Sequence, residues 1–148
     1  MAPSEIDWEL ESRGRVVLES ATEMFGDERF AGAWYEHGPV PTLHVFAVDP
    51  VQSEITALDT TAKEAGLGLT VIPARYSYVE LVEFCERLSD AMPGGDACFG
   101  FGPDPRANAI QFTLRRLDED VLAYIRERIP ADAIRIIVKP RAPRAVAI

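Results

Sequence analysis

The same order of secondary-structure elements is predicted twice along this chain of 148 residues, and that repeat restricts the fold more than any other feature. Two strand-like runs, a helical run and a third strand are expected at residues 30–36, 42–49, 53–65 and 69–74. The order returns at residues 98–102, 109–114, 118–128 and 133–139. Strand runs are rich in β-branched residues, and helical runs carry apolar residues at helical spacing. We therefore expect an α+β fold with a duplicated ββαβ unit, whose small antiparallel or mixed sheets each pack on helices.

The two units can be matched segment by segment. Residues 32–35 match 100–102, residues 43–48 match 109–114, and residues 69–73 match 134–138. Units of this size are small for independent domains, so they would share a core or lie end to end.

Two more helices are expected, one before the first unit and one between the units. The first covers residues 4–25, and Gly14 lowers its helix propensity by about 1 kcal/mol relative to Ala, so a break there is possible. The second runs from Ser77 to Met92, with Glu80 completing a capping box. Ser53 and Asp118 are the expected N-caps of the repeated helices. The predicted boundaries are 1–28 for the acidic N-terminal helix, 29–76 for the first unit, 77–96 for the linking helix, 97–139 for the second unit and 140–148 for a basic, proline-containing tail.

Charge argues against nucleic-acid binding, since a net charge of −9 leaves no surplus of cations for phosphate. The charge is uneven, because residues 4–28 are mainly acidic and residues 134–148 are basic without any acid. The two ends could attract each other, or they could be a solvated helix and a loose tail. No apolar run approaches the roughly 20 residues that cross a membrane, and the amino terminus is acidic where a secretory signal would be basic. We therefore expect a cytoplasmic protein without membrane contact.

No catalytic group is evident in the sequence. His37 and His44 are the only histidines, in a predicted turn and a predicted strand, far in sequence from Cys85 and Cys98. The Gly-x-Ser-x-Gly nucleophile motif is absent, so we expect a protein that is not an enzyme and needs no cofactor. Both cysteines are interpreted as small buried hydrophobic residues.

Two possible binding motifs in the sequence are disfavoured. Glu36, His37, His44 and Asp49 could in principle hold a metal ion, but a polar turn beside an outward-facing strand position explains them more simply. The Gly-Phe-Gly run at residues 100–102 resembles the start of a phosphate loop. Pro103 and Pro105 follow it without the N–H groups that would bind an anion, so that interpretation fails.

Three short runs resemble the pro-regions found before secreted bacterial serine proteases of the alpha-lytic protease and streptogrisin type. They are Phe-Ala-Gly-Ala-Trp-Tyr at residues 30–35, Pro-Ala-Arg-Tyr-Ser-Tyr at 73–78 followed by Glu80-Leu81, and Gly-Pro-Asp-Pro-Arg-Ala-Asn at 102–108. With the element order, the resemblance covers about residues 28–139. It implies a folding chaperone and tight inhibitor that docks its sheet and tail against a protease. The chain departs from that pattern, because we expect neither a signal peptide nor a following protease domain.

Six residues are candidates for contact with a partner, which is expected to be a protein. Trp34 and Tyr35 could anchor an interface, although packing in the core or on a sheet face explains either one as well. Arg106 could pair with a partner carboxylate, although it lies in a segment that suits a tight turn. In the tail, Arg141, Arg144 and Ile148 could add a strand to a partner's edge or occupy a cleft, or could belong to a frayed terminus.

Two functions follow from these observations. The first is a non-enzymatic binding protein that recognises another protein through strand edges or its carboxyl tail. The alternative is a regulatory domain that senses a small molecule in a groove between the two units.

Overall fold

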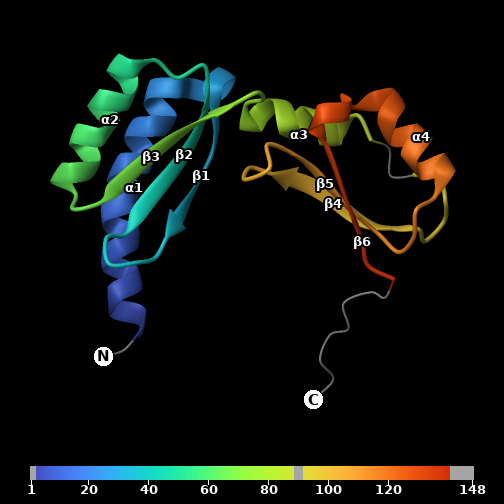
Figure 1. Cartoon of the computed structure of the whole chain (residues 1–148), viewed down its shortest axis with the longest axis horizontal. Coiled ribbons are helices and arrows are strands. Elements are labelled where there is room, and N and C mark those ends of the chain that lie inside the picture. Colours follow the sequence, from blue (N-terminus) through green and yellow to red (C-terminus); the bar gives the residue numbers. More distant parts are fainter. Residues whose placement is uncertain (1–2, 89–91, 141–148) are drawn as a thin grey trace. The chain divides into compact units, whose positions relative to one another are not determined.

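The computed structural model of the chain describes residues 3–88 and 92–140, with side chains from residue 11 onward. It confirms the α+β fold, in which an N-terminal helix is followed by two β-β-α-β units (Figure 1). The chain divides into two compact units, unit 1 at Met1–Val79 and unit 2 at Glu80–Ile148. In the described part of the chain, no helix is long and apolar enough to cross a membrane.

Unit 1 is a three-stranded mixed sheet with two helices on one face (Figure 1). Its elements are α1 (Pro3–Arg29), β1 (Phe30–Glu36), β2 (Thr42–Val48), α2 (Gln52–Glu64) and β3 (Gly68–Ala74). The central strand β2 is antiparallel to β1 and parallel to β3. The core lies between the sheet and the helices, and its fully buried members include Val17, Ala21, Leu43, Val45 and Leu58.

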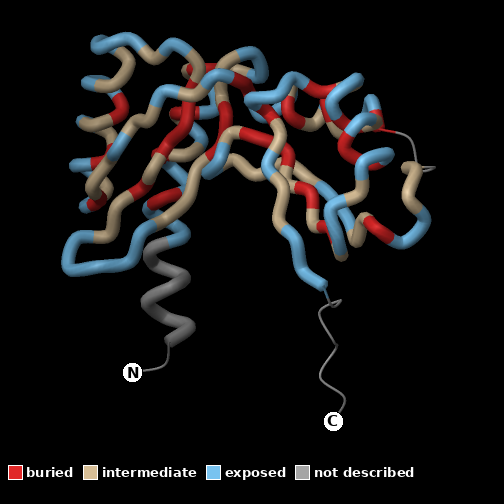
Figure 2. The backbone as a smooth tube through the Cα atoms, turned by 45° about the vertical axis from the view of Figure 1, so that its right-hand side comes forward, coloured by how far each residue is buried: buried red, intermediate tan, exposed pale blue. Residues whose placement is uncertain are grey.

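Unit 2 repeats this arrangement. The helix α3 (Tyr78–Glu86) begins at the end of unit 1 and continues into unit 2. The other elements of unit 2 are β4 (Cys98–Asp104), β5 (Ala109–Leu114), α4 (Glu119–Arg128), a 3-10 turn η1 (Ala131–Ala133) and β6 (Ile134–Val138). The central strand β5 is antiparallel to β4 and parallel to β6. Figure 2 shows the buried residues, in red, inside each unit. Ile110, Phe112 and Leu114 form the buried face of β5, and Gln111 and Thr113 lie on the opposite, outer face.

The repeat extends to details of strand pairing. A β-bulge starts the first strand of each sheet, between Phe30 and Gly32 in β1 and between Cys98 and Gly100 in β4. Leu43 pairs with Leu69 in unit 1 as Ile110 pairs with Ile134 in unit 2. Residues 42–47 therefore correspond to 109–114, so the sequence match of 43–48 with 109–114 is wrong by one residue. That match aligned two apolar runs and ignored their alternation between the sheet faces.

Several predicted helix boundaries need correction. α1 is not broken at Gly14; its irregularity is at Gly26, where φ is 64°. α2 begins one residue before Ser53, and its N-cap position is Val51. α3 ends at Glu86, and the N–H of Leu88 bonds to the carbonyl of Cys85 in a tighter turn that follows; within the predicted continuation to Met92, residues 89–91 lie outside the described part of the chain.

Two other boundaries bear on the site. Asp118 is confirmed as an N-cap, because its carboxylate accepts hydrogen bonds from the N–H groups of Asp120 and Val121 at 3.0 and 3.1 Å. β4 continues beyond Gly102 to Asp104, so Pro103 and Asp104 belong to the strand and not to the predicted connection.

Arg29 joins the end of α1 to the start of α2. Its guanidinium donates hydrogen bonds of 2.8 and 2.6 Å to the carboxylate of Glu54. It also donates to the carbonyls of Val48 and Asp49, at 3.1 and 2.8 Å. Glu54 accepts a further bond from the N–H of Val51 at 3.1 Å. The hydrogen bond from Arg29, followed by that from Val51, lowers the pKa of Glu54 below its usual value.

We expect Glu54→Gln to lower the melting temperature by a few degrees near neutral pH. The pKa of Glu54 is lower in the folded state than in the unfolded state, where it is about 4.3. The stabilisation is therefore present above about pH 4.3 and is lost as the pH falls through the folded-state pKa. Thermal unfolding of both proteins across this range should show a difference that narrows in acid. Glu64→Gln, on the same helix, controls for net charge; a difference that stays constant in acid would contradict this role.

Candidate functional site

The structure places the predicted contact residues on different surfaces. Trp34 and Tyr35 are neighbours in β1 and face opposite sides of the sheet, since Trp34 pairs with His44 and Tyr35 with Leu43. Tyr35 packs against the core of unit 1. Arg106 is exposed in the β4–β5 turn, where its N–H donates to the side chain of Asp104 at 3.1 Å. Arg141, Arg144 and Ile148 lie outside the described residues.

A stacked pair occupies the outer face of the unit 1 sheet. The rings of Trp34 and His44 lie 4.2 Å apart between centroids and are inclined by 8°. The Nε2 atom of His44 is 2.9 Å from a carboxylate oxygen of Glu36. Glu36 and His44, two of the four residues considered for a metal site, are therefore in contact, but the described residues contain no group of three or more side chains placed to hold a metal.

Both cysteines are partly buried, and so are less enclosed than the small buried hydrophobic residues that the sequence predicts. Burial raises the pKa of both thiols above the ordinary value. The carboxylate of Glu86 raises the pKa of Cys85 further, whereas a backbone hydrogen bond with Gly100 lowers that of Cys98. Because a thiolate is the reactive form, the raised pKa disfavours a nucleophilic role for either cysteine near neutral pH.

The outer face of the unit 2 sheet contains a hollow of about 450 Å³, which we call the glycine trough. Gly100 and Gly102 of β4 pair with Thr113 and Gln111 of β5, and all four line it. At one end, Asp104 pairs with Arg135 of β6 across the central strand, with 3.1 Å between their charged atoms. The trough therefore has a backbone floor, polar side chains along it and an ion pair at its end.

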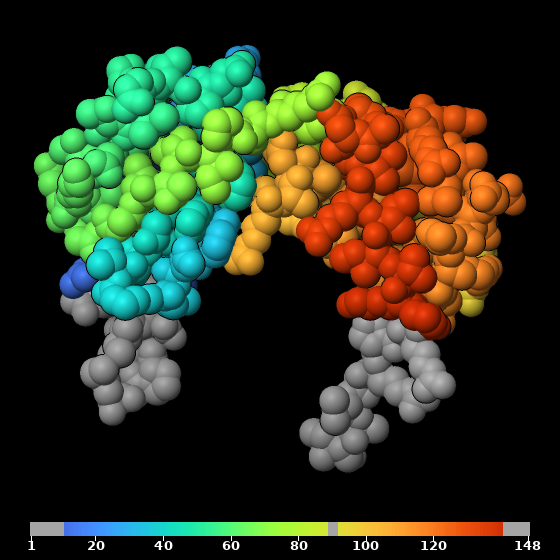
Figure 3. All heavy atoms as spheres, viewed as in Figure 1, coloured from blue at the N-terminus to red at the C-terminus, as the bar shows by residue number. Residues whose placement is uncertain are grey.

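The edge strand β6 presents backbone groups on its outer side. It pairs on its inner side with β5. The N–H of Lys139 donates to the carbonyl of Leu114 at 2.7 Å, so this N–H faces β5. Because N–H groups alternate sides along a strand, those of Val138 and Ile136 face away from the sheet. Figure 3 shows the red carboxyl-terminal part of unit 2, which includes β6, at the surface beside the orange atoms of α4.

A second hollow lies beside β6, with a volume of about 340 Å³. It is lined by Ile134 and Ile136 of β6 together with Arg126 of α4 and Ala131 of η1. Both isoleucines are only partly buried. An apolar side chain placed next to β6 could therefore bury surface against them.

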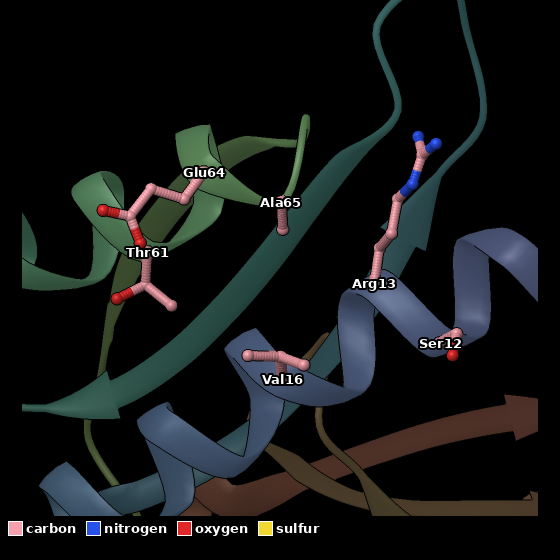
Figure 4. Close-up of a pocket in the computed structure, with 6 residues that line it drawn as sticks. All are labelled: Ser12, Arg13, Val16, Thr61, Glu64 and Ala65. Carbon is pink, nitrogen blue, oxygen red and sulfur yellow. The ribbon is translucent and has the colours of Figure 1, made fainter.

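A third hollow, of about 470 Å³, lies between α1 and α2 in unit 1. Figure 4 shows Arg13 of α1 and Glu64 of α2 on opposite sides of it, with Val16 and Ala65 between them in this view. Val16 is 55% exposed. The hollow is a shallow groove with opposite charges on its two sides.

Sequence reasoning did not identify the glycine trough or the β6 edge as particular sites. As a binding motif, the Gly-Phe-Gly run suggests only a phosphate loop, although glycines at alternate strand positions also signal close approach of another group to the backbone. Comparison with known proteins found no matching family model and no matching curated protein.

Proposed function

We propose that this protein acts by binding and not by catalysis, and that it recognises an extended segment of a partner protein by pairing it with the outer edge of β6. The observation that carries this proposal is an outward-facing row of backbone groups on β6 beside a partly apolar hollow. A strand added there gains main-chain hydrogen bonds from the edge and specificity from the hollow. The resemblance to protease pro-regions is in keeping with protein recognition. The proposal includes a cytoplasmic setting, which suits two cysteines present as free thiols.

Comparison with the other edge strands distinguishes β6. Free edges are usually protected by prolines, bulges or charges. β1 and β4 start with bulges, and β3 and β4 contain Pro73 and Pro103. β6 has the sequence Ile-Arg-Ile-Ile-Val, without a proline or a bulge. Its only charge, on Arg135, is directed across the sheet to Asp104 and so protects the edge less.

Charge indicates the kind of segment that β6 would bind. Arg126 lines the adjacent hollow, and the exposed Lys139 follows the strand. A segment in which acidic residues alternate with apolar ones would place its apolar side chains over Ile134 and Ile136 and its acids on the opposite face of the sheet, where Lys139 lies. The partner segment is therefore proposed to be extended, β-prone and acidic.

The equivalent strand of unit 1 suggests a substitution that would block the outer edge of β6. Pro73 in β3 pairs with Ala47 at the position where Val138 in β6 pairs with Leu114. β3 keeps its parallel pairing with a proline there, which fits an outward-facing position without an N–H. Val138→Pro should therefore remove an outer donor and preserve the fold, and Pro73→Val should open the equivalent edge of β3.

We expect an acetylated hexapeptide of alternating valine and glutamate to shift the amide resonances of Ile136 and Val138 in NMR titrations. Val138→Pro should weaken this binding by about tenfold or more, because the added strand loses a main-chain bond and meets the proline ring. Pro73→Val should leave it intact and produce new shifts in β3. A peptide of alternating valine and lysine tests the charge. Equal affinity for the parent and Val138→Pro would refute the proposal, as would self-association through β6 without peptide binding.

A further inference from the structure

The outer faces of the two sheets differ at one pair of equivalent positions. Trp34 in unit 1 pairs with His44, and Gly102 in unit 2 pairs with Gln111. Both positions follow a bulge glycine by two residues, Gly32 in one sheet and Gly100 in the other. Unit 1 therefore has an indole stacked on the side chain of the central strand, and unit 2 has the glycine trough at the same place.

The backbone conformation at Gly100 and Gly102 does not require glycine. Gly32 has φ of 138°, which disfavours other residues, but Gly100 and Gly102 do not have positive φ. A Cβ atom added to Gly100 or Gly102 would meet no neighbouring atom within 4 Å. Glycine inside a strand costs conformational entropy and provides no side chain for packing. Two such glycines at alternate positions are explained if another group lies directly on the strand.

The internal repeat indicates what that group is. On the unit 1 sheet the same position accommodates an indole, which lies nearly parallel to the ring of His44. In unit 2 the planar amide of Gln111 replaces that ring, and Thr113 adds a hydroxyl beside it. A volume of about 450 Å³ leaves room for an aromatic side chain, and the lining side chains offer polar partners for an indole N–H.

We propose that the glycine trough binds the indole side chain of a tryptophan supplied by a partner protein. The ring lies on the backbone of Gly100 and Gly102, stacked on the amide of Gln111. This seat is formed by β4 and β5, so it does not depend on strand addition at β6. Binding at the glycine trough and strand addition at β6 can therefore be tested independently.

The test uses N-acetyl-tryptophanamide as the probe and N-acetyl-leucinamide as the control, with NMR detection of amide resonances. The indole should move the resonances of Gly100 and Gly102 and of the Gln111 side-chain amide upfield through its ring current. Gly102→Trp restores the residue present in unit 1 and should fill the trough, weakening the binding of the probe by about tenfold or more. In this variant, the new indole should show nuclear Overhauser contacts to the side chain of Gln111.

Further variants separate the possible outcomes. Gly102→Ala adds only a small group in open space and should reduce binding less than Gly102→Trp does. Val138→Pro removes an outer donor of β6, which is the edge strand opposite β4, and should leave probe binding unchanged. Gly102→Trp should in turn leave binding of the valine–glutamate peptide unchanged. Equal responses to the two probes, shifts elsewhere in the chain, or undiminished binding by a folded Gly102→Trp protein would each overturn the proposal.

Discussion

Gly14→Ala should destabilise unit 1 by about 1–2 kcal/mol, although alanine is the better helix former. A Cβ atom added to Gly14 would overlap the phenol ring of Tyr35, which crosses α1 at this point. Overpacking a core contact costs roughly 1–3 kcal/mol, and the gain in helix propensity is at most about 1 kcal/mol. Steric overlap should therefore outweigh propensity. Urea unfolding of the parent and the variant, monitored by circular dichroism, measures the difference.

The sign of the effect should reverse when the ring is removed. In a Tyr35→Leu background the added methyl group has space, so Gly14→Ala should stabilise the protein by up to about 1 kcal/mol. Burial, followed by the Glu11 carboxylate, raises the pKa of the Tyr35 phenol, in keeping with a ring inserted beside the helix. Destabilisation of equal size in both backgrounds would show that Tyr35 is not the cause.

Gly14 also shows the limit of sequence reasoning about this fold. The strand and helix periodicities predict both units, because each element carries its own pattern of buried residues. The pattern around Gly14 indicates only a weak helix, since propensity is a local property. The reason for the glycine is a side chain from β1, a contact between distant residues that one sequence does not reveal.

The candidate sites were harder to predict from the sequence for a related reason. Trp34 and Tyr35 are candidates because of their residue types. Which face of the sheet each side chain occupies depends on the register of β1 against β2. The glycine trough exists because two positions of β4 have no side chain. It is recognised as a site only when Gly102 is compared with Trp34 at the equivalent position. The β6 edge is defined by which strand ends the sheet, which depends on the order of the strands.

The corrected match between the units gives the prediction with the largest effect, at the pair Val45 and Phe112. Both side chains are fully buried at the middle of the central strand. Phe112→Ala should destabilise unit 2 by roughly 3–5 kcal/mol, because it leaves a large cavity. It also removes the contact with the ring of Phe101, whose centroid lies 5.6 Å away. Because a single core in so small a unit rarely supplies more than about 3–5 kcal/mol, the variant should lose the native amide resonances of β4, β5 and β6.

Val45→Ala is the matched variant in unit 1 and should cost roughly 2 kcal/mol, since it removes two methyl groups and leaves a smaller cavity. Its β1, β2 and β3 resonances should survive at room temperature with a lower urea midpoint. Phe112→Leu, which keeps most of the apolar volume, should retain the native spectrum of unit 2 and so separate cavity formation from general intolerance of substitution. A cost below about 1 kcal/mol for Phe112→Ala would mean that this ring is not central to the core of unit 2.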